Sequence, residues 1–251
     1  MTIDEPELAE VIKRTLGEDH AAPDPDDVLT LYFGLPAVDE DGGVFREQRG
    51  TVDGITEIVA RPHRRHVRSS FEASFRDARH VSDGGRSWIG AIGYLVFLDG
   101  LGGAVRPIDH ARRPSGSDLE RALEMFTDCD RRQRCALYAL RCCLAHDFSL
   151  ANLAENVSKK NQHLYRHYFN LPPARQLDGI AEFPDEPWDG NYESLRPTFV
   201  DIGRLEDVAT EAHDSALAAW VDGCLELRVP ALEARHRFIF GHPEEIGVDD
   251  G

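Results

Sequence analysis

The segment that most constrains the fold is residues 87–105, SWIGAIGYLVFLDGLGGAV, which is apolar on nearly every side. A helix that is hydrophobic all round is buried in a protein core or spans a membrane. The longest apolar run, Trp88 to Leu98, contains Gly90 and Gly93 and is too short to cross a bilayer. We therefore predict a fully buried central helix around which the rest of the chain packs.

Helical signals lie on both sides of this segment. Val67, Phe71 and Phe75 fall on one face of a helix that is expected from about residue 63. Capping boxes, in which a polar residue is followed three positions later by Glu or Gln, predict helix starts at Ser117 and Asp130. Other helices are expected from Asp4 to Gly17, over 131–148 and over about 204–227, and residues 28–33 fit either a helix or a strand.

After residue 150 the apolar residues alternate with a period of two. Residues 163–171, HLYRHYFNL, place Tyr165, His167, Phe169 and Leu171 on one side, which is typical of a strand. Residues 198–202 and 236–240 are two more candidate strands. The prediction is a mainly α fold, a single domain over residues 1–251 built as a helical bundle with a small β-hairpin insertion. Its expected parts are an irregular N-terminal region (18–60), a helical core (about 63–228), a hairpin and loop insertion (about 160–202) and a flexible tail (243–251).

The charge balance limits the partners that the chain can bind. Its formal net charge is -17, and a uniformly acidic surface repels nucleic acids and anionic membranes. Binding to RNA therefore requires a local basic patch, and the dense basic cluster of the sequence is RPHRRHVR at 61–68. Its side chains are candidate RNA-binding residues, although a solvated helix start paired with acidic neighbours also explains them. The cluster comprises Arg61, His63, Arg64, Arg65, His66 and Arg68.

The cysteines and the N-terminal residues indicate the compartment. The five cysteines form no C-x-x-C pair, so neither a zinc ribbon nor a disulfide framework is expected. Cys142 and Cys143 fit small core residues better than nucleophiles. The N-terminal residues are acidic and have no long apolar run, so no signal peptide is expected. We therefore expect a cytoplasmic protein with reduced thiols and no contact with a membrane.

One helix carries residues that suggest chemistry. In residues 131–150, Leu137, Leu140, Leu144 and Phe148 define the predicted buried stripe, and Arg141 falls within it. An arginine in an apolar face needs either a partner or a functional role. His146 lies five residues after it, on an adjacent strip of the same helix.

An arginine and a histidine side by side suit RNA cleavage without a metal. Histidine can act as general base or acid near neutral pH and activate the ribose 2′-OH. Arginine can hold the scissile phosphate and offset the charge that develops on it. Two such pairs, apposed across a two-fold homodimer, would form a composite site.

The segment Arg141-Cys-Cys-Leu-Ala-His146 resembles the motif of the HEPN (higher eukaryotes and prokaryotes nucleotide-binding) superfamily. The resemblance covers about residues 63–228 in helical order and these six residues in detail. It implies a small helical bundle that acts as an RNase of a toxin or defence system, with Arg141 and His146 as the catalytic residues. The family commonly has a polar residue after the arginine, whereas this chain has Cys142.

The spacing of this pair is not specific by itself. Chance predicts roughly three such pairs in a chain so rich in arginine. The context separates them, because Gly or Pro interrupts each of the others, whereas Arg141 and His146 share an uninterrupted amphipathic helix. The alternative is an ion-paired core arginine and a histidine that favours the helix C-terminus. The other pairs are Arg14/His20, Arg61/His66, Arg235/His242 and Arg237/His242.

Other types of site fit the sequence less well. The pairs His63/His66 and His163/His167 each lack a third metal ligand. Gly116-Ser117 followed by Asp128 and Asp130 is weakly similar to a nucleotidyltransferase motif, but these aspartates lie in a link between helices rather than on a strand. No P-loop, nucleophile-elbow or dinucleotide-binding signature occurs.

Two hypotheses from different classes follow. The first is a HEPN-like endoribonuclease, a homodimer that uses no metal or cofactor, acting on RNA as a toxin or defence effector with a protein antitoxin as a partner. The second is a non-catalytic helical module that binds RNA or a protein, in which Arg141 is structural.

Overall fold

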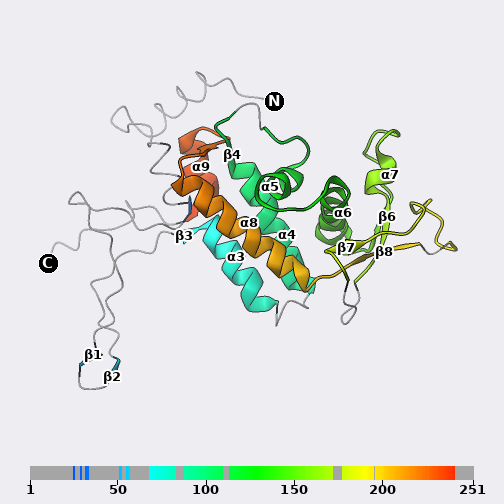
Figure 1. Ribbon diagram of the computed structural model, residues 1–251, viewed down its shortest axis with the longest axis horizontal. Helices are drawn as coiled ribbons and strands as arrows, with labels where there is room; N and C mark the ends of the chain where they lie inside the picture. The colour runs from blue at the N-terminus through cyan, green and yellow to red at the C-terminus, as the bar shows by residue number, and fades with distance from the viewer. Residues whose placement is uncertain are drawn as a thin grey trace.

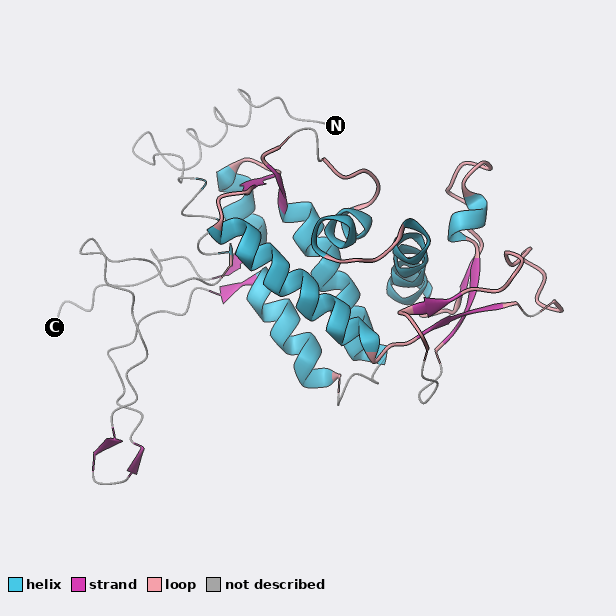
Figure 2. Cartoon of the chain, viewed as in Figure 1, coloured by secondary structure: helices cyan, strands magenta, loops and turns pink. Residues whose placement is uncertain are grey.

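A computed structural model describes much of the chain from residue 68 onward and a few residues before it. The predicted helix after Asp4, most of the region 18–60 and the tail 243–251 lie outside the described residues. As predicted, the fold is mainly α with a minor β component (Figure 2). The described residues are 25, 29, 32–33, 51–52, 55–56, 68–82, 88–109, 113–171, 177–194 and 196–240.

Helix α4 (Trp88–Ala104) is the centre of the bundle. It packs against α3 (Ser70–Val81), α5 (Asp118–Phe126) and α8 (Arg204–Val221) (Figure 1). The prediction of a central helix is therefore confirmed. The expectation that this helix is buried on every side is wrong, because Ile89 is 55% exposed and Val96 is 46% exposed.

A glycine sets how closely α4 and α5 approach each other. A Cβ atom built on Gly102 would overlap the carbonyl oxygen of Asp118 at the start of α5. The side chains of Leu98, Leu101 and Leu119 are fully buried in the core around this contact. Gly102 thus allows the backbones of α4 and α5 to meet.

Both predicted capping boxes are present. Ser117 caps α5 and exchanges hydrogen bonds with Glu120, and Asp130 caps α6 (Arg131–Cys142) and exchanges hydrogen bonds with Gln133. A π-helical turn, η2 (Cys143–Asp147), continues α6 to its end. The predicted helix 131–148 is therefore confirmed, with a change of helical type in its last turn.

The β insertion is a mixed sheet rather than a hairpin. Its order is β5-β6-β8-β7, and β6 (His167–Asn170) pairs in parallel with β8 (Pro197–Val200). The period-two pattern correctly places His167, Phe169 and Leu171 in the interior. Tyr165 instead ends the short helix α7 (Gln162–Tyr165). The outer strands are β5 (Ala151–Asn152) and β7 (Ala181–Glu182).

Several short elements complete the described chain. Strand β4 (Val105–Pro107) pairs with β9 (Leu225–Leu227), and β3 (Arg68–Ser69) pairs with β10 (Ile239–Phe240). Helix α3 begins at Ser70 with Ser69 as its cap, later than predicted. Most of the strand predicted over 236–240 belongs to helix α9 (Ala231–Phe238). The remaining strands, β1 (Thr51–Val52) and β2 (Ile55–Thr56), pair with each other.

Within the described residues, no helix combines the length and the apolar character that crossing a bilayer requires.

Candidate functional site

The helix that carries Arg141 and His146 changes register at its end. Leu137, Leu140 and Leu144 are buried as predicted. Phe148, the fourth member of the predicted stripe, is 57% exposed and has a left-handed backbone with φ 50°. The π-turn places one extra residue in the last turn, so Phe148 leaves the buried face. Its assignment to the buried stripe was therefore wrong.

The same turn changes how Arg141 and His146 are related. In a regular α-helix, residues five positions apart lie about 140° apart around the axis. In η2 the hydrogen bonds span five residues, and the N–H of Phe148 donates to the carbonyl of Cys143. Because the π-turn is wider, it reduces the angle around the helix axis that separates Arg141 from His146. His146 is exposed, in the last turn of the helix.

Arg141 is ion-paired with an aspartate on the central helix. Its Nη2 donates to Oδ2 of Asp99 at 2.9 Å, and both side chains are 25% exposed. Asp99 is the single charged residue of α4. Within the part of the chain that the structure describes, the buried Nε of Arg141 has no hydrogen-bond partner. The arginine is therefore held in place, and one of its donors is unused.

A second arginine lies close to the same aspartate. Arg121 of α5 is near enough to Asp99 for the carboxylate to favour its charged form. Arg121 also forms an ion pair with Asp118, and the same Oδ1 of Asp118 accepts from Nη1 of Arg228 at 2.7 Å. Like Arg141, Arg121 has a buried Nε without a partner among the described residues. Arginines and aspartates thus alternate across α6, α4 and α5.

A second group of ion pairs lies next to Arg228, and its Arg106 is close enough to lower the pKa of Arg228. Glu226 on β9 accepts from Nε of Arg106 on β4 at 2.7 Å, and Arg113 lies 3.5 Å from the same carboxylate oxygen. We call the five arginines of this row the arginine ladder. The carboxylates between them are Asp99, Asp118 and Glu226, so the row carries a net positive charge in a chain of net charge -17. The ladder consists of Arg141, Arg121, Arg228, Arg106 and Arg113.

Crowding of positive charge affects two ladder residues. Burial lowers the pKa of Arg121, and the charge of Arg228 lowers it further. Burial also lowers the pKa of Arg228, with a further contribution from Arg106. The arginines nevertheless stay charged in proteins. A bound anion would relieve this repulsion.

The basic cluster predicted to bind RNA is mostly not described. Arg61, His63, Arg64, Arg65 and His66 lie outside the described residues. The backbone of Arg68 belongs to β3 and is paired with Phe240. These residues remain sequence-based candidates.

The histidine pair on the insertion does not resemble a metal site. His163 is exposed on α7, whereas His167 is buried. Both ring nitrogens of His167 are engaged at 2.9 Å, by the hydroxyl of Thr198 and the carbonyl of Leu164. Among the described residues, no three His, Cys, Asp or Glu side chains gather as a metal site requires.

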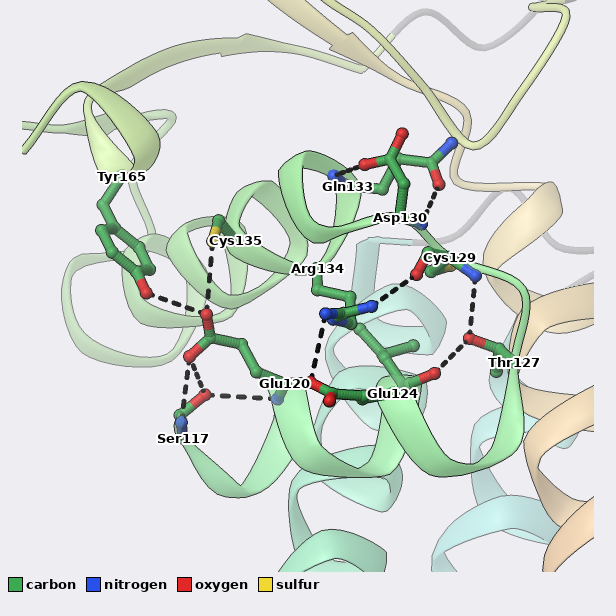
Figure 3. Close-up of polar contacts among 11 residues, drawn as sticks. Ser117, Glu120, Glu124, Thr127, Cys129, Asp130, Gln133, Arg134, Cys135 and Tyr165 are labelled. Atoms are coloured by element: carbon green, nitrogen blue, oxygen red, sulfur yellow. Dashed lines mark hydrogen bonds and ion pairs between the residues drawn. The ribbon is translucent and has the colours of Figure 1, made fainter. Parts of the chain in front are cut away.

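A buried carboxylate joins α5, α6 and α7. Glu120 accepts hydrogen bonds from the backbone and hydroxyl of Ser117, from the hydroxyl of Tyr165 and from the thiol of Cys135 (Figure 3). Burial alone would raise the pKa of Glu120, but these hydrogen bonds outweigh it and the pKa is lowered. The sequence predicted Glu120 as a capping residue, and its contacts with α6 and α7 add a role in tertiary structure. Because its hydrogen bonds are made within the fold, we assign it no catalytic role.

Of the two adjacent cysteines predicted to be core residues, Cys143 is buried and Cys142 is half-buried. Burial raises the pKa of Cys135 to about 11 and that of Cys143 to about 12, so both remain thiols near neutral pH. The residues of the weak nucleotidyltransferase pattern are structural too, because Ser117 and Asp130 are helix caps.

Among the ladder arginines and their carboxylates the sequence predicted Arg141 alone, so Asp99, Arg121, Arg228 and the others were not predicted. A signal for Asp99 was present, because a single aspartate in an otherwise apolar helix needs a partner. Arg228 meets Asp118 across 110 positions of the chain, and no local pattern predicts such a contact.

Comparisons of the chain with protein-family models, curated proteins and solved structures found no match. The HEPN resemblance therefore rests on the six residues from Arg141 to His146 and on the helical order.

Proposed function

We propose that this protein is a HEPN-like endoribonuclease that cleaves RNA without a metal or another cofactor. The observation that carries the proposal is an exposed His146 in a π-turn, five residues after an arginine that belongs to a positively charged row. π-turns within α-helices occur frequently at functional sites. An acidic chain that concentrates arginines at one place provides the local basic patch that RNA binding requires.

The proposed chemistry is transesterification within the RNA strand. The ribose 2′-oxygen attacks the adjacent phosphorus, the bond to the 5′-oxygen breaks, and the products are a 2′,3′-cyclic phosphate and a 5′-hydroxyl. His146 either takes the proton from the 2′-OH or gives one to the leaving 5′-oxygen. Arg141 stabilises the negative charge on the phosphate oxygens in the transition state.

One histidine cannot be both base and acid in the same step, which favours a homodimer. The outward face of α4 is suited to a second copy. Ile89 and Val96 are exposed on it, Ile92 is half-buried, and there is open space beside Gly100. The charge on this face, Asp99, is neutralised by Arg141. Two α4 faces packed together would bring two copies of Arg141 towards one another.

The proposal also includes a biological setting. A nuclease of this kind would act in the cytoplasm as a toxin or defence effector, held in check by a protein antitoxin. Expression of the chain by itself would then arrest growth, whereas expression of a His146→Ala variant would not.

The second candidate is a non-catalytic helical module that binds RNA or a protein. The ion pair between Arg141 and Asp99 favours this candidate, because one nitrogen of the guanidinium already donates to a carboxylate. In this alternative Arg141 joins α6 to α4, and His146 is a solvated residue near a helix C-terminus.

Degradation of RNA by the purified protein in EDTA separates the two candidates. The variants are His146→Ala and, as a matched control, His163→Ala, which removes another exposed histidine. The proposal predicts cleavage by wild type and by the control, with a reduction of at least about 100-fold in His146→Ala. Equal cleavage by all three proteins, or none by wild type across varied RNAs, would favour the non-catalytic module.

A further inference from the structure

We propose that the arginine ladder is a binding track for the phosphate groups of single-stranded RNA. Arg121 and Arg228 would contact phosphates neighbouring the one held by Arg141. This inference rests on the proposed function, because it names further residues with which the same site would hold its substrate.

The guanidinium groups of the ladder are suited to a ligand that bears oxygen atoms. The buried Nε atoms of Arg121 and Arg141 have no partner within the described residues. Buried donors without a partner are rare in proteins, and each needs an explanation. A phosphate oxygen is an acceptor that guanidinium groups bind well, with two parallel hydrogen bonds. Arg166, outside the ladder, has the same unused Nε, so the case for more than one phosphate rests on the number of arginines in the row.

The carboxylates of the row keep the arginines in place when RNA is absent. Asp118 accepts from Arg228 at 2.7 Å and also pairs with Arg121, while Asp99 pairs with Arg141. Arg228 also donates to the carbonyl of Gly102 at 2.8 Å, which fixes its side chain against α4. A preorganised arginine loses little conformational entropy when it binds. The arginines are thus held in position for an anion. The ladder also keeps a net positive charge, because arginines outnumber carboxylates.

The arrangement fits a strand of RNA better than a single small anion. Arg141 and Arg121 come from α6 and α5, Arg106 comes from β4, and Arg228 and Arg113 lie just after β9 and between β4 and α5, so the ladder extends across several elements of the bundle. A single phosphate could contact only part of this row. An unpaired strand can follow it, and its backbone is free to place the 2′-oxygen in line with the scissile bond at Arg141.

Binding is measured by fluorescence anisotropy with a labelled 2′-O-methyl oligouridine. This probe has the phosphates of RNA but no 2′-OH, so cleavage cannot affect the measurement. The variants are Arg121→Gln and Arg228→Gln, and the matched control is Arg76→Gln, which removes the same charge from an exposed site on α3. We expect each ladder variant to bind several-fold more weakly than the control. The slope of log affinity against log salt should also fall by about 0.7 for each phosphate that the variant no longer binds.

A ladder variant could bind more weakly because it is partly unfolded. A variant that is expected to bind more tightly avoids this ambiguity. Asp118→Asn removes a carboxylate that competes for Arg121 and Arg228, so it should bind the probe more tightly than Asp77→Asn, an exposed control on α3. Equal binding by this pair would contradict the proposal. So would ladder variants that bind as Arg76→Gln does and melt at the wild-type temperature.

The ladder proposal and the nuclease proposal can fail separately. If the ladder variants lose affinity but wild type cleaves no RNA, the ladder stands and the nuclease proposal fails. If wild type cleaves RNA but the ladder variants match Arg76→Gln in affinity and salt dependence, the ladder proposal fails alone.

Discussion

Arg141 of α6 and Asp99 of α4 form a 2.9 Å ion pair at the edge of the central helix. Arg141 is the strongest functional candidate of the sequence, and Asp99 is the one charged residue of the otherwise apolar α4. The same contact can stabilise the bundle or hold an arginine ready for a phosphate. A substitution of the aspartate separates these two effects.

Asp99→Asn should weaken the fold slightly and strengthen binding to RNA. A partly exposed ion pair contributes about 0.5–1 kcal/mol to the free energy of unfolding. Removal of the carboxylate frees Arg141 for phosphate, so affinity for the 2′-O-methyl oligouridine should rise several-fold. Asp77→Asn is the control, because it changes the net charge equally at an exposed site. If the two variants bind equally well, Arg141 does not contact the phosphates.

Gly102→Ala should destabilise the protein, whereas Gly100→Ala should not. A Cβ at residue 102 overlaps the carbonyl of Asp118, and such overpacking costs about 1–3 kcal/mol or more. A Cβ at residue 100 meets open space, and replacing glycine within a helix contributes about 0.5–1 kcal/mol of stability. Urea denaturation at equal protein concentration measures both. Similar stabilities for the two variants would mean that α4 and α5 are not packed as described.

His167 should make the fold sensitive to acid. Burial lowers its pKa from 6.5 to about 4, although the hydrogen bond to Leu164 opposes this shift. The unfolded chain therefore binds the proton more tightly than the folded one, and the stability contributed above pH 6.5 is lost as the pH falls towards 4. The stability of wild type relative to His167→Gln should fall by about 3 kcal/mol over this range. Parallel stability curves would show that His167 is not held neutral.

His213 should have the opposite dependence on pH. Its ring stacks on Phe71 and Phe75, with centroid distances of 4.8 and 4.6 Å. Burial alone would lower the pKa of His213, but hydrogen bonds to Glu72 and Asp214 outweigh it and the pKa is raised.

A raised pKa means that the folded state binds the proton of His213 more tightly. Its stabilising effect is complete below 6.5, the pKa of an ordinary histidine, and is lost as the pH rises through the folded pKa. The stability difference between wild type and His213→Gln, from chemical denaturation, should therefore be larger at pH 5.5 than at pH 9. An equal difference at both pH values would rule out a charged His213 between α3 and α8.

The sequence predicted local features best. The capping boxes at Ser117 and Asp130 are confirmed because each depends on residues three positions apart. The apolar segment was correctly placed at the centre of the bundle, but helical periodicity cannot show that one face of α4 would stay uncovered. The wrong assignment of Phe148 has a similar cause, since a change to π-helical hydrogen bonds alters the period on which the prediction depends.

Contacts between segments that are distant along the chain could not be predicted from the sequence. Strands β6 and β8 were expected to form a hairpin because they are near in sequence, yet they pair in parallel. Arg141 was expected to need either a partner or a functional role, but nothing nearby in the sequence identified Asp99, which precedes it by 42 positions. Much of the candidate site, the ladder beyond Arg141, depends on such contacts.

The chemical identity of the RNA ends tests the central claim most directly. A defined single-stranded RNA is incubated with the purified protein in EDTA, and the products are analysed by mass spectrometry. The proposed mechanism predicts 2′,3′-cyclic phosphate and 5′-hydroxyl ends with wild type and His163→Ala, and intact RNA with His146→Ala. Ends that carry a 5′-phosphate, or cleavage that persists in His146→Ala, would contradict it.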